Sequence, residues 1–141
     1  MSISAVRTYF KNRIKDEVST AVEHTDAFNI ENMHTSSRDK MFHIIYQNSS
    51  NIETEGDRVT DNISVTISMI FKGYRNTQSA FDSTSNTAHN IKLRASKISN
   101  YTGGIKRVVC DNITITPADD SNDNILLVSM EFSVRMDFNT I

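Results

Sequence analysis

The sequence predicts an α+β fold in which a mostly antiparallel β-sheet carries an N-terminal helix and a second helix on one face. Four segments are rich in β-forming residues and are separated by polar or turn-forming residues. Two other segments place apolar residues at steps of three and four, as amphipathic helices do. Along the chain the order is helix, strand, strand, helix, strand, strand, which is typical of a layered α+β domain.

The most regular segment is the last one, residues 125–138. Apolar residues occupy every second position from Leu126 to Phe138, and the alternate positions from Ser129 to Asp137 are polar. This period of two predicts a strand with one buried and one exposed face. Strands usually have about 5–6 residues, whereas this one would span roughly 45 Å at about 3.3 Å per residue. Its length points to a surface shared between subunits.

Two amphipathic helices are predicted. The first covers residues 3–22, with Ser2 or Ser4 as its N-terminal cap. The second begins at Asn76 or Thr77, and cations gather near its C-terminal end, where they suit the helix dipole.

Three further strands are predicted over residues 41–47, 63–71 and 105–116. Pro117 should end the third of these, because proline cannot donate a hydrogen bond to a sheet. Residues 118–124 are turn-forming, and they should join the last two strands into a β-hairpin.

Two polar stretches are predicted to be loops. Residues 23–40 are irregular, with one short strand or turn near Phe28–Ile30. Residues 48–62 are polar and somewhat acidic, and loops of this length in compact domains are usually functional or mobile.

Size and composition favour one domain over residues 1–141. A chain of 141 residues can bury a real core, since a domain of about 150 residues buries roughly 70% of its unfolded surface. The net charge of −2 and a pI near 6.0 do not suggest a nucleic-acid partner. Cys110 is the single cysteine, so no intrachain disulfide is possible, and it is interpreted as a small buried hydrophobe.

The sequence shows no targeting or membrane signal. The N-terminus lacks the apolar run of a signal peptide, and no stretch approaches the roughly 20 apolar residues of a membrane span. We therefore expect a soluble protein made in a cytoplasm.

No catalytic or metal-binding signature is present. The histidines show no ligand spacing with one another or with the cysteine; they are His24, His34, His43 and His89. There is no nucleophile elbow, phosphate loop or dinucleotide fingerprint. We expect no catalytic residue, no cofactor and no metal.

Residues 120–131 partly match a calcium-binding loop. Its positions 1, 3, 5 and 12 would be Asp120, Asn122, Asn124 and Glu131. Position 6, which requires glycine, is Ile125, and Glu131 lies inside the strand alternation. The segment is therefore interpreted as a hairpin turn.

Residues 58–94 and the two strands after them resemble a known family. The residues concerned are Arg58-Val-Thr-Asp-Asn-Ile-Ser-Val-Thr-Ile-Ser-Met-Ile-Phe-Lys-Gly-Tyr-Arg-Asn, Ala80-Phe-Asp, Asn90-Ile-Lys-Leu-Arg, Val108-Val-Cys-Asp, Pro117 and Ser121-Asn-Asp-Asn. They are similar to the tail terminator (tail completion) proteins of long-tailed bacteriophages. The resemblance covers most of the chain through structural patterns, and residues 23–57 lie outside it.

The resemblance implies a non-enzymatic virion protein of the phage neck, made in the host cytoplasm. Such proteins form a ring, typically a homo-hexamer, on the last ring of the tail tube protein. They end polymerisation and provide the docking surface for the head–tail connector or stopper protein. DNA only passes through the lumen, and a pI near 6.0 suits passage better than tight binding. Neither a membrane nor a small-molecule substrate is implied.

Candidate interface residues come from three places. Tyr74 and Arg75 combine two residue types that are enriched at interface centres, although Tyr74 packed on the next helix and Arg75 in solvent is an equal alternative. Segments that could order on docking are the stretch 48–62 and the turn before the last strand. Their candidate residues are Asp57, Arg58, Asp119, Asp120 and Asn122.

Two other functions stay open at this point. One is another phage neck or tail-tube component, which the same strands and helices would serve. The other is a cellular ligand-binding or regulatory α+β domain, which should have a concave apolar pocket.

Overall fold

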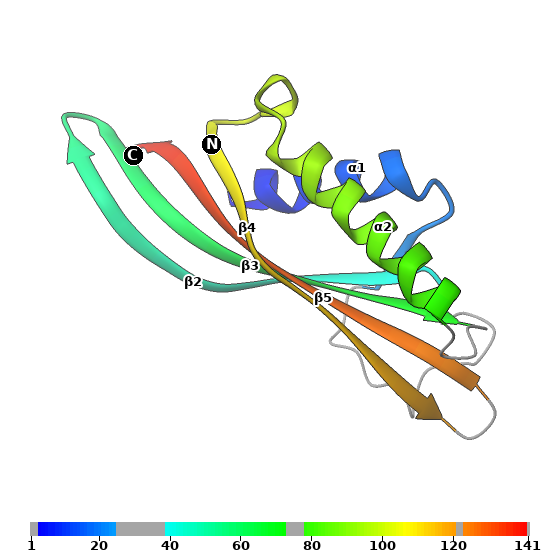
Figure 1. Ribbon diagram of the computed structural model, residues 1–141. Coiled ribbons are helices and arrows are strands. Elements are labelled where there is room, and N and C mark those ends of the chain that lie inside the picture. The colour runs from blue at the N-terminus through cyan, green and yellow to red at the C-terminus, as the bar shows by residue number, and fades with distance from the viewer. Residues whose placement is uncertain (1–2, 25–38, 73–77, 121–122, 141) are drawn as a thin grey trace.

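The computed structural model describes residues 3–24, 39–72, 78–120 and 123–140. Its elements in chain order are α1 (Ser4–Glu17), β1 (Val22–Glu23), β2 (Met41–Glu55), β3 (Arg58–Lys72), α2 (Gln78–Ser96), the 3-10 turn η3 (Ile98–Asn100), β4 (Ile105–Asp120) and β5 (Asp123–Asn139). Both helices lie on one side of a long, curved sheet (Figure 1). The predicted α+β class is confirmed.

The sheet has five strands in the order β1-β2-β3-β5-β4. Among the strand pairs that the structure describes, only the short contact between β1 and β2 is parallel. In the centre, β3 pairs with β5 along its whole length, from Arg58 opposite Asn139 to Lys72 opposite Ile125. The predicted hairpin of the last two strands is confirmed, because β4 pairs antiparallel with β5.

The core lies between the helices and one face of β3 and β5. Ile63, Val65 and Ile67 are buried there beside their partners on β5. The alternation predicted for the last strand is confirmed, since its even-numbered residues from Leu126 to Met136 are all buried. From α1, Phe10 packs against Phe132 with 4.8 Å between the ring centroids. These contacts fix which face of the sheet the helices cover.

A buried tyrosine joins the two helices. Tyr9 on α1 donates a hydrogen bond to the carbonyl oxygen of Ala95 on α2, at 2.5 Å. The Tyr9 side chain is only 2% exposed, and this burial raises its pKa to about 12. The hydroxyl is therefore held neutral and serves as a packing residue with one satisfied donor.

The predicted loop over residues 48–62 is wrong. β2 continues to Glu55 and β3 starts at Arg58, so these residues form the outer part of a β-hairpin. Gly56 makes the turn with φ of 59°, a conformation that glycine adopts at low cost. The segment looked like a loop because Asn, Ser and Glu are poor strand formers, but pairing with β3 overrides that preference.

Several predicted boundaries shift as well. α1 ends at Glu17, and Val22 belongs to β1, where its side chain is 58% exposed. β4 passes through Pro117 to Asp120, which an edge strand tolerates because the missing N–H costs no ladder bond on its outer side.

The predicted helix caps are partly testable. The cap position of α1 is Ile3, which makes no side-chain cap, and Ser4 is already helical, so Ser4 is not the cap. Ser2, Asn76, Thr77 and Phe28–Ile30 lie outside the described residues.

Candidate assembly interface

The predicted interface residues fall at opposite ends of the sheet. Asp57 lies in the β2–β3 hairpin turn, and Arg58 begins β3 opposite Asn139. Asp119 and Asp120 end β4, beside the far end of β5. Fourteen residue steps along β3 separate the two ends by about 46 Å at 3.3 Å per step. The predicted residues therefore fall into two separate groups, one at each of the two opposite hairpin ends of the sheet (Figure 1).

The remaining predicted residues cannot be placed. Tyr74, Arg75 and Asn122 lie outside the described residues, and for Asp119 and Asp120 only the backbone is described. The backbone there confirms the hairpin interpretation of the former calcium-loop match. Asp120 pairs with Asp123, and Glu131 lies within β5 opposite Asn112.

A charged cluster forms beside the β2–β3 turn, around Asp137 of β5. Its carboxylate accepts a hydrogen bond from Thr60 Oγ1 at 2.6 Å. Arg58 and Lys106 approach the same carboxylate at 3.9 and 3.8 Å, and Arg58 also pairs with Glu55 at 3.3 Å. These exposed ion pairs are each worth about 0–1 kcal/mol, so the cluster shapes this end more than it stabilises it.

The sheet has two long open edges. β1 pairs only with Met41 and Phe42, so β2 from Ile44 to Glu55 has no neighbour on its outer side among the described residues. Among the described strands β4 is the other edge, and at one point the Tyr101 hydroxyl accepts a hydrogen bond from the Val108 N–H at 3.0 Å. Unpaired edge strands offer rows of N–H and C=O groups to another chain, and proteins usually blunt or use them.

Each edge strand carries two bulges. In β2 they fall between Tyr46 and Asn48 and between Asn51 and Glu53. In β4 they fall between Ile105 and Arg107 and between Cys110 and Asn112. A bulge adds one residue to a strand and re-aims the side chains after it. The bulges therefore decide which charged residues reach which face of the sheet.

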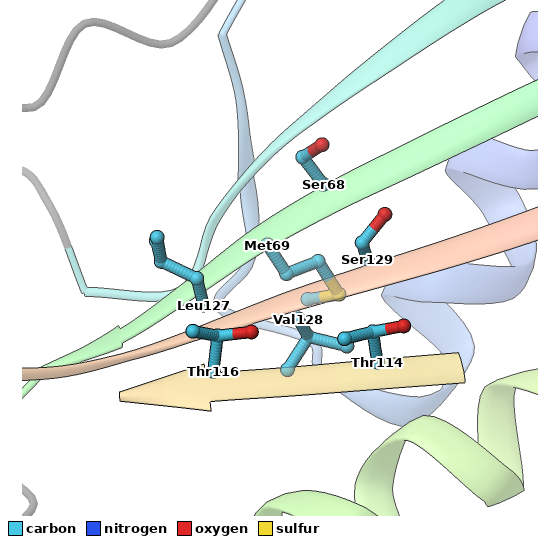
Figure 2. A pocket seen from close by; sticks show the side chains of 7 residues that line it. All are labelled: Ser68, Met69, Thr114, Thr116, Leu127, Val128 and Ser129. Atoms are coloured by element: carbon cyan, nitrogen blue, oxygen red, sulfur yellow. The ribbon is translucent and has the colours of Figure 1, made fainter. Parts of the chain in front are cut away.

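The face that the helices leave uncovered is rich in hydroxyl groups over its middle. A hollow of about 380 Å³ lies there, lined by Ser68, Met69, Thr114, Thr116, Leu127, Val128 and Ser129. Figure 2 shows Ser68 and Ser129 side by side with their hydroxyls pointing the same way. None of these seven described side chains is titratable. Toward Lys72 the same face becomes apolar, with Ile70 and Ile125 buried.

A smaller, charged hollow of about 190 Å³ lies on the same face nearer the β2–β3 hairpin. It is lined by Asn62, Arg107, Val109, Asp111, Ser133 and Arg135. Arg107 stands directly opposite Arg135, while Ser133 Oγ donates a 2.6 Å hydrogen bond to Asp111. Neither arginine has an ion-pair partner in the part of the chain that the structure describes.

This arginine pair is not among the interface residues predicted from the sequence. Both residues lie in strands that were predicted to form a hairpin, so their proximity could have been suspected. Their exact pairing depends on the bulge at Lys106, which has no signature in the sequence.

The side chains that could carry chemistry are dispersed. Among residues 3–24, 39–72, 78–117 and 125–140, no group of three or more His, Cys, Asp or Glu side chains could hold a metal ion. Cys110 is half-buried, and burial raises the pKa of its thiol, so it stays protonated near neutral pH. The ring nitrogens Nδ1 of His43 and His89 form hydrogen bonds with the backbone carbonyl oxygens of His24 and Ser85, each at 2.8 Å.

None of the described helices is both long and apolar enough to cross a bilayer.

The fold is similar to that of solved protein structures. No protein-family model and no curated protein matches the sequence. A solved chain from the virion of a native gene transfer agent particle is similar, with a TM-score of 0.56 and 11% identity over 92% of both chains. A second solved chain, which carries a sequence identifier instead of a functional name, has a TM-score of 0.50 and 12% identity, covering 95% of this chain and 96% of its own. These likenesses show a shared fold across nearly the whole chain.

Proposed function

We propose that this protein is a structural component of a phage or phage-like virion, and that it acts without catalysis as the tail terminator. In this role it forms a ring, a homo-hexamer, on the end of the tail tube. The ring ends polymerisation of the tube protein and presents a docking surface to the head–tail connector. DNA passes through its lumen.

The observation that carries the proposal is the fold shared with a chain of the gene transfer agent virion over 92% of both chains. A fold by itself does not give a function, but the geometry adds independent support. A closed ring is built from heterologous contacts, so each subunit needs two different surfaces that match. The outer edges of β2 and β4 are two such surfaces on opposite sides of one sheet.

A terminator also needs two different axial faces, one for the tube and one for the connector. The sheet ends in two different hairpins, β2–β3 at one end and β4–β5 at the other, about 46 Å apart measured along the strands. Asp57 and Arg58 lie at the first end, and Asp119 and Asp120 lie at the second. This separation suits a subunit that contacts different partners above and below.

The experiment is a measurement of mass in solution by light scattering after size exclusion, over a range of concentrations, with and without purified tail tubes. A ring of about six subunits, or a monomer that closes into a ring only on tube ends, supports the proposal. Growth into open-ended tubes would identify a tail-tube component instead. A monomer that ignores tube ends and binds a small ligand would favour a regulatory domain and would contradict the terminator function.

A further inference from the structure

We infer that neighbouring copies of this protein join edge to edge: the outer edge of β2 on one copy lies antiparallel to the outer edge of β4 on the next, and Glu53 faces the Arg107–Arg135 pair. The inference deepens the proposed function, because it names the contact that would close the ring.

The strand directions permit this pairing. β2 is antiparallel to β3, β3 to β5, and β5 to β4, so β2 and β4 run in opposite directions. Rotation about an axis roughly along the strands leaves each strand direction unchanged. A β2 edge brought to the β4 edge of the next copy therefore meets it antiparallel. Within one chain the Val108 N–H already donates to the Tyr101 hydroxyl at 3.0 Å, so an antiparallel ladder would use the other outward N–H and C=O groups of β4.

The charged residues lie within two residues of the same level along the strands. Glu53 stands opposite Thr60, and Thr60 stands opposite Asp137. Arg107 stands opposite Arg135, which is two residues from Asp137 on β5. Glu53 and Arg107 are thus offset by about 7 Å along the strand direction, within the reach of an arginine side chain.

They also lie on the same face of the sheet. Residues directly opposite each other in a ladder share a face, and so do residues two apart on one strand. Glu53, Arg107 and Arg135 therefore all belong to the face that the helices leave uncovered. The bulges before Glu53 and before Arg107 place both residues on that face.

Glu53 is opposite in charge to Arg107 and Arg135. Glu53, Arg107 and Arg135 are exposed, and none of them has an ion-pair partner among the described residues. The outer part of β2, residues 48–55, carries Glu53 and Glu55 and no cation. Complementary charges across an interface select the partner and set its register.

A phosphate of passing DNA is the other anion that two arginines could hold. The second copy is favoured because its β2 edge carries Glu53, which lies within two residues of the Arg107–Arg135 level along the strands. The net charge of −2 likewise gives the chain little attraction for nucleic acid.

Charge exchange tests the contact. Arg107→Glu alone and Glu53→Arg alone should each raise the concentration for half-assembly by about tenfold or more, since like charges then meet. Both changes in one chain restore opposite charges and should restore assembly, and a mixture of the two single variants should also assemble. Lys97→Glu is the matched control, because it makes the same charge change on an exposed side chain outside both edges.

Zero-length carbodiimide coupling gives a second readout that uses the unaltered chain. In one chain β2 and β4 are three strand spacings apart, about 14 Å, which excludes a direct amide bond between Lys106 and Glu53 or Glu55. A bond between these residues in the assembled protein, identified by mass spectrometry, would therefore join two copies. Lys106→Arg should abolish it.

The outcomes separate the inference from the proposed function. Rings that persist in both single variants, with no coupled peptide, would refute the edge contact and leave the terminator function intact. A native chain that forms no ring even on tail tubes would refute both. If Arg107→Glu left the particle mass unchanged but abolished binding of a short DNA duplex, the arginines would be a phosphate site instead. Far-UV circular dichroism of each variant confirms that the fold is retained.

Discussion

Arg107 and Arg135 stand directly opposite each other on β4 and β5, on the sheet face that carries no helix. Cross-strand like charges destabilise a sheet, so an isolated subunit bears a small cost for keeping this pair. Such a cost is consistent with a partner that supplies negative charge, and the acidic end of β2 on a neighbouring copy has that chemistry.

Replacing one of these arginines should stabilise the monomer. Arg107→Thr removes the repulsion and introduces a β-branched residue, so the free energy of unfolding should rise by about 0.2–1 kcal/mol at low salt. Urea unfolding at low and high salt measures the effect, which salt should reduce. Lys97→Thr is the control. A stability loss specific to Arg107→Thr would show that the arginine is satisfied within its own chain.

Shortening the β2–β3 hairpin should spare folding and harm assembly. In the proposed variant a two-residue turn replaces residues 51–61 and joins Ser50 to Asn62, which already face each other. The removed part of β2 is exposed on both faces. Of the removed β3 residues only Thr60 is buried, and the core pairs from Ile63 onward remain. Circular dichroism should keep its β-sheet signal while light scattering shows loss of the ring. An unfolded product would contradict this prediction.

The contact between Phe10 and Phe132 should be among the most sensitive in the chain. Phe132 is 1% exposed and its ring lies 4.8 Å from that of Phe10, so Phe132→Ala should lower the free energy of unfolding by about 3–5 kcal/mol. Denaturant unfolding measures the loss. Ile52→Ala is the control, because Ile52 is 44% exposed and its truncation should cost about 0.5 kcal/mol or less. Equal losses in both variants would mean that the outer hairpin packs more tightly than described.

Stability should fall at high pH because of Tyr9. Burial raises its pKa from 10.0 to about 12, so the unfolded chain loses the phenol proton first. The Tyr9 contribution is fully present below pH 10 and is lost as pH rises through about 12, by up to about 2–3 kcal/mol. Unfolding free energies at pH 8 to 11 should show this decline.

Tyr9→Phe should flatten that decline, although it also removes the hydrogen bond to the Ala95 carbonyl and lowers stability at neutral pH by about 1–2 kcal/mol. Tyr46→Phe is a useful comparison, because burial also raises the pKa of Tyr46. If the free energy of unfolding of Tyr9→Phe fell with pH as steeply as that of the native chain, groups other than Tyr9 would cause the loss of stability at high pH.

Local patterns were enough for the fold class. The alternation from Leu126 to Met136 and the helical spacing around Phe10 each report which side of an element is buried, and burial depends on neighbours two to four residues away. The hairpin of the last two strands followed from turn-forming residues for the same reason.

The candidate site depended on contacts that are distant in sequence. Residues 48–55 form a strand only because β3 pairs with them, and their composition alone favours a loop. Arg107 meets Arg135 only because a bulge at Lys106 shifts the register by one residue. Sequence by itself therefore determined the class of fold and the buried faces, through short-range periodicity. The tertiary structure decided the open edges, the opposed hairpins and the arginine pair, because strand order and register are set by long-range pairing.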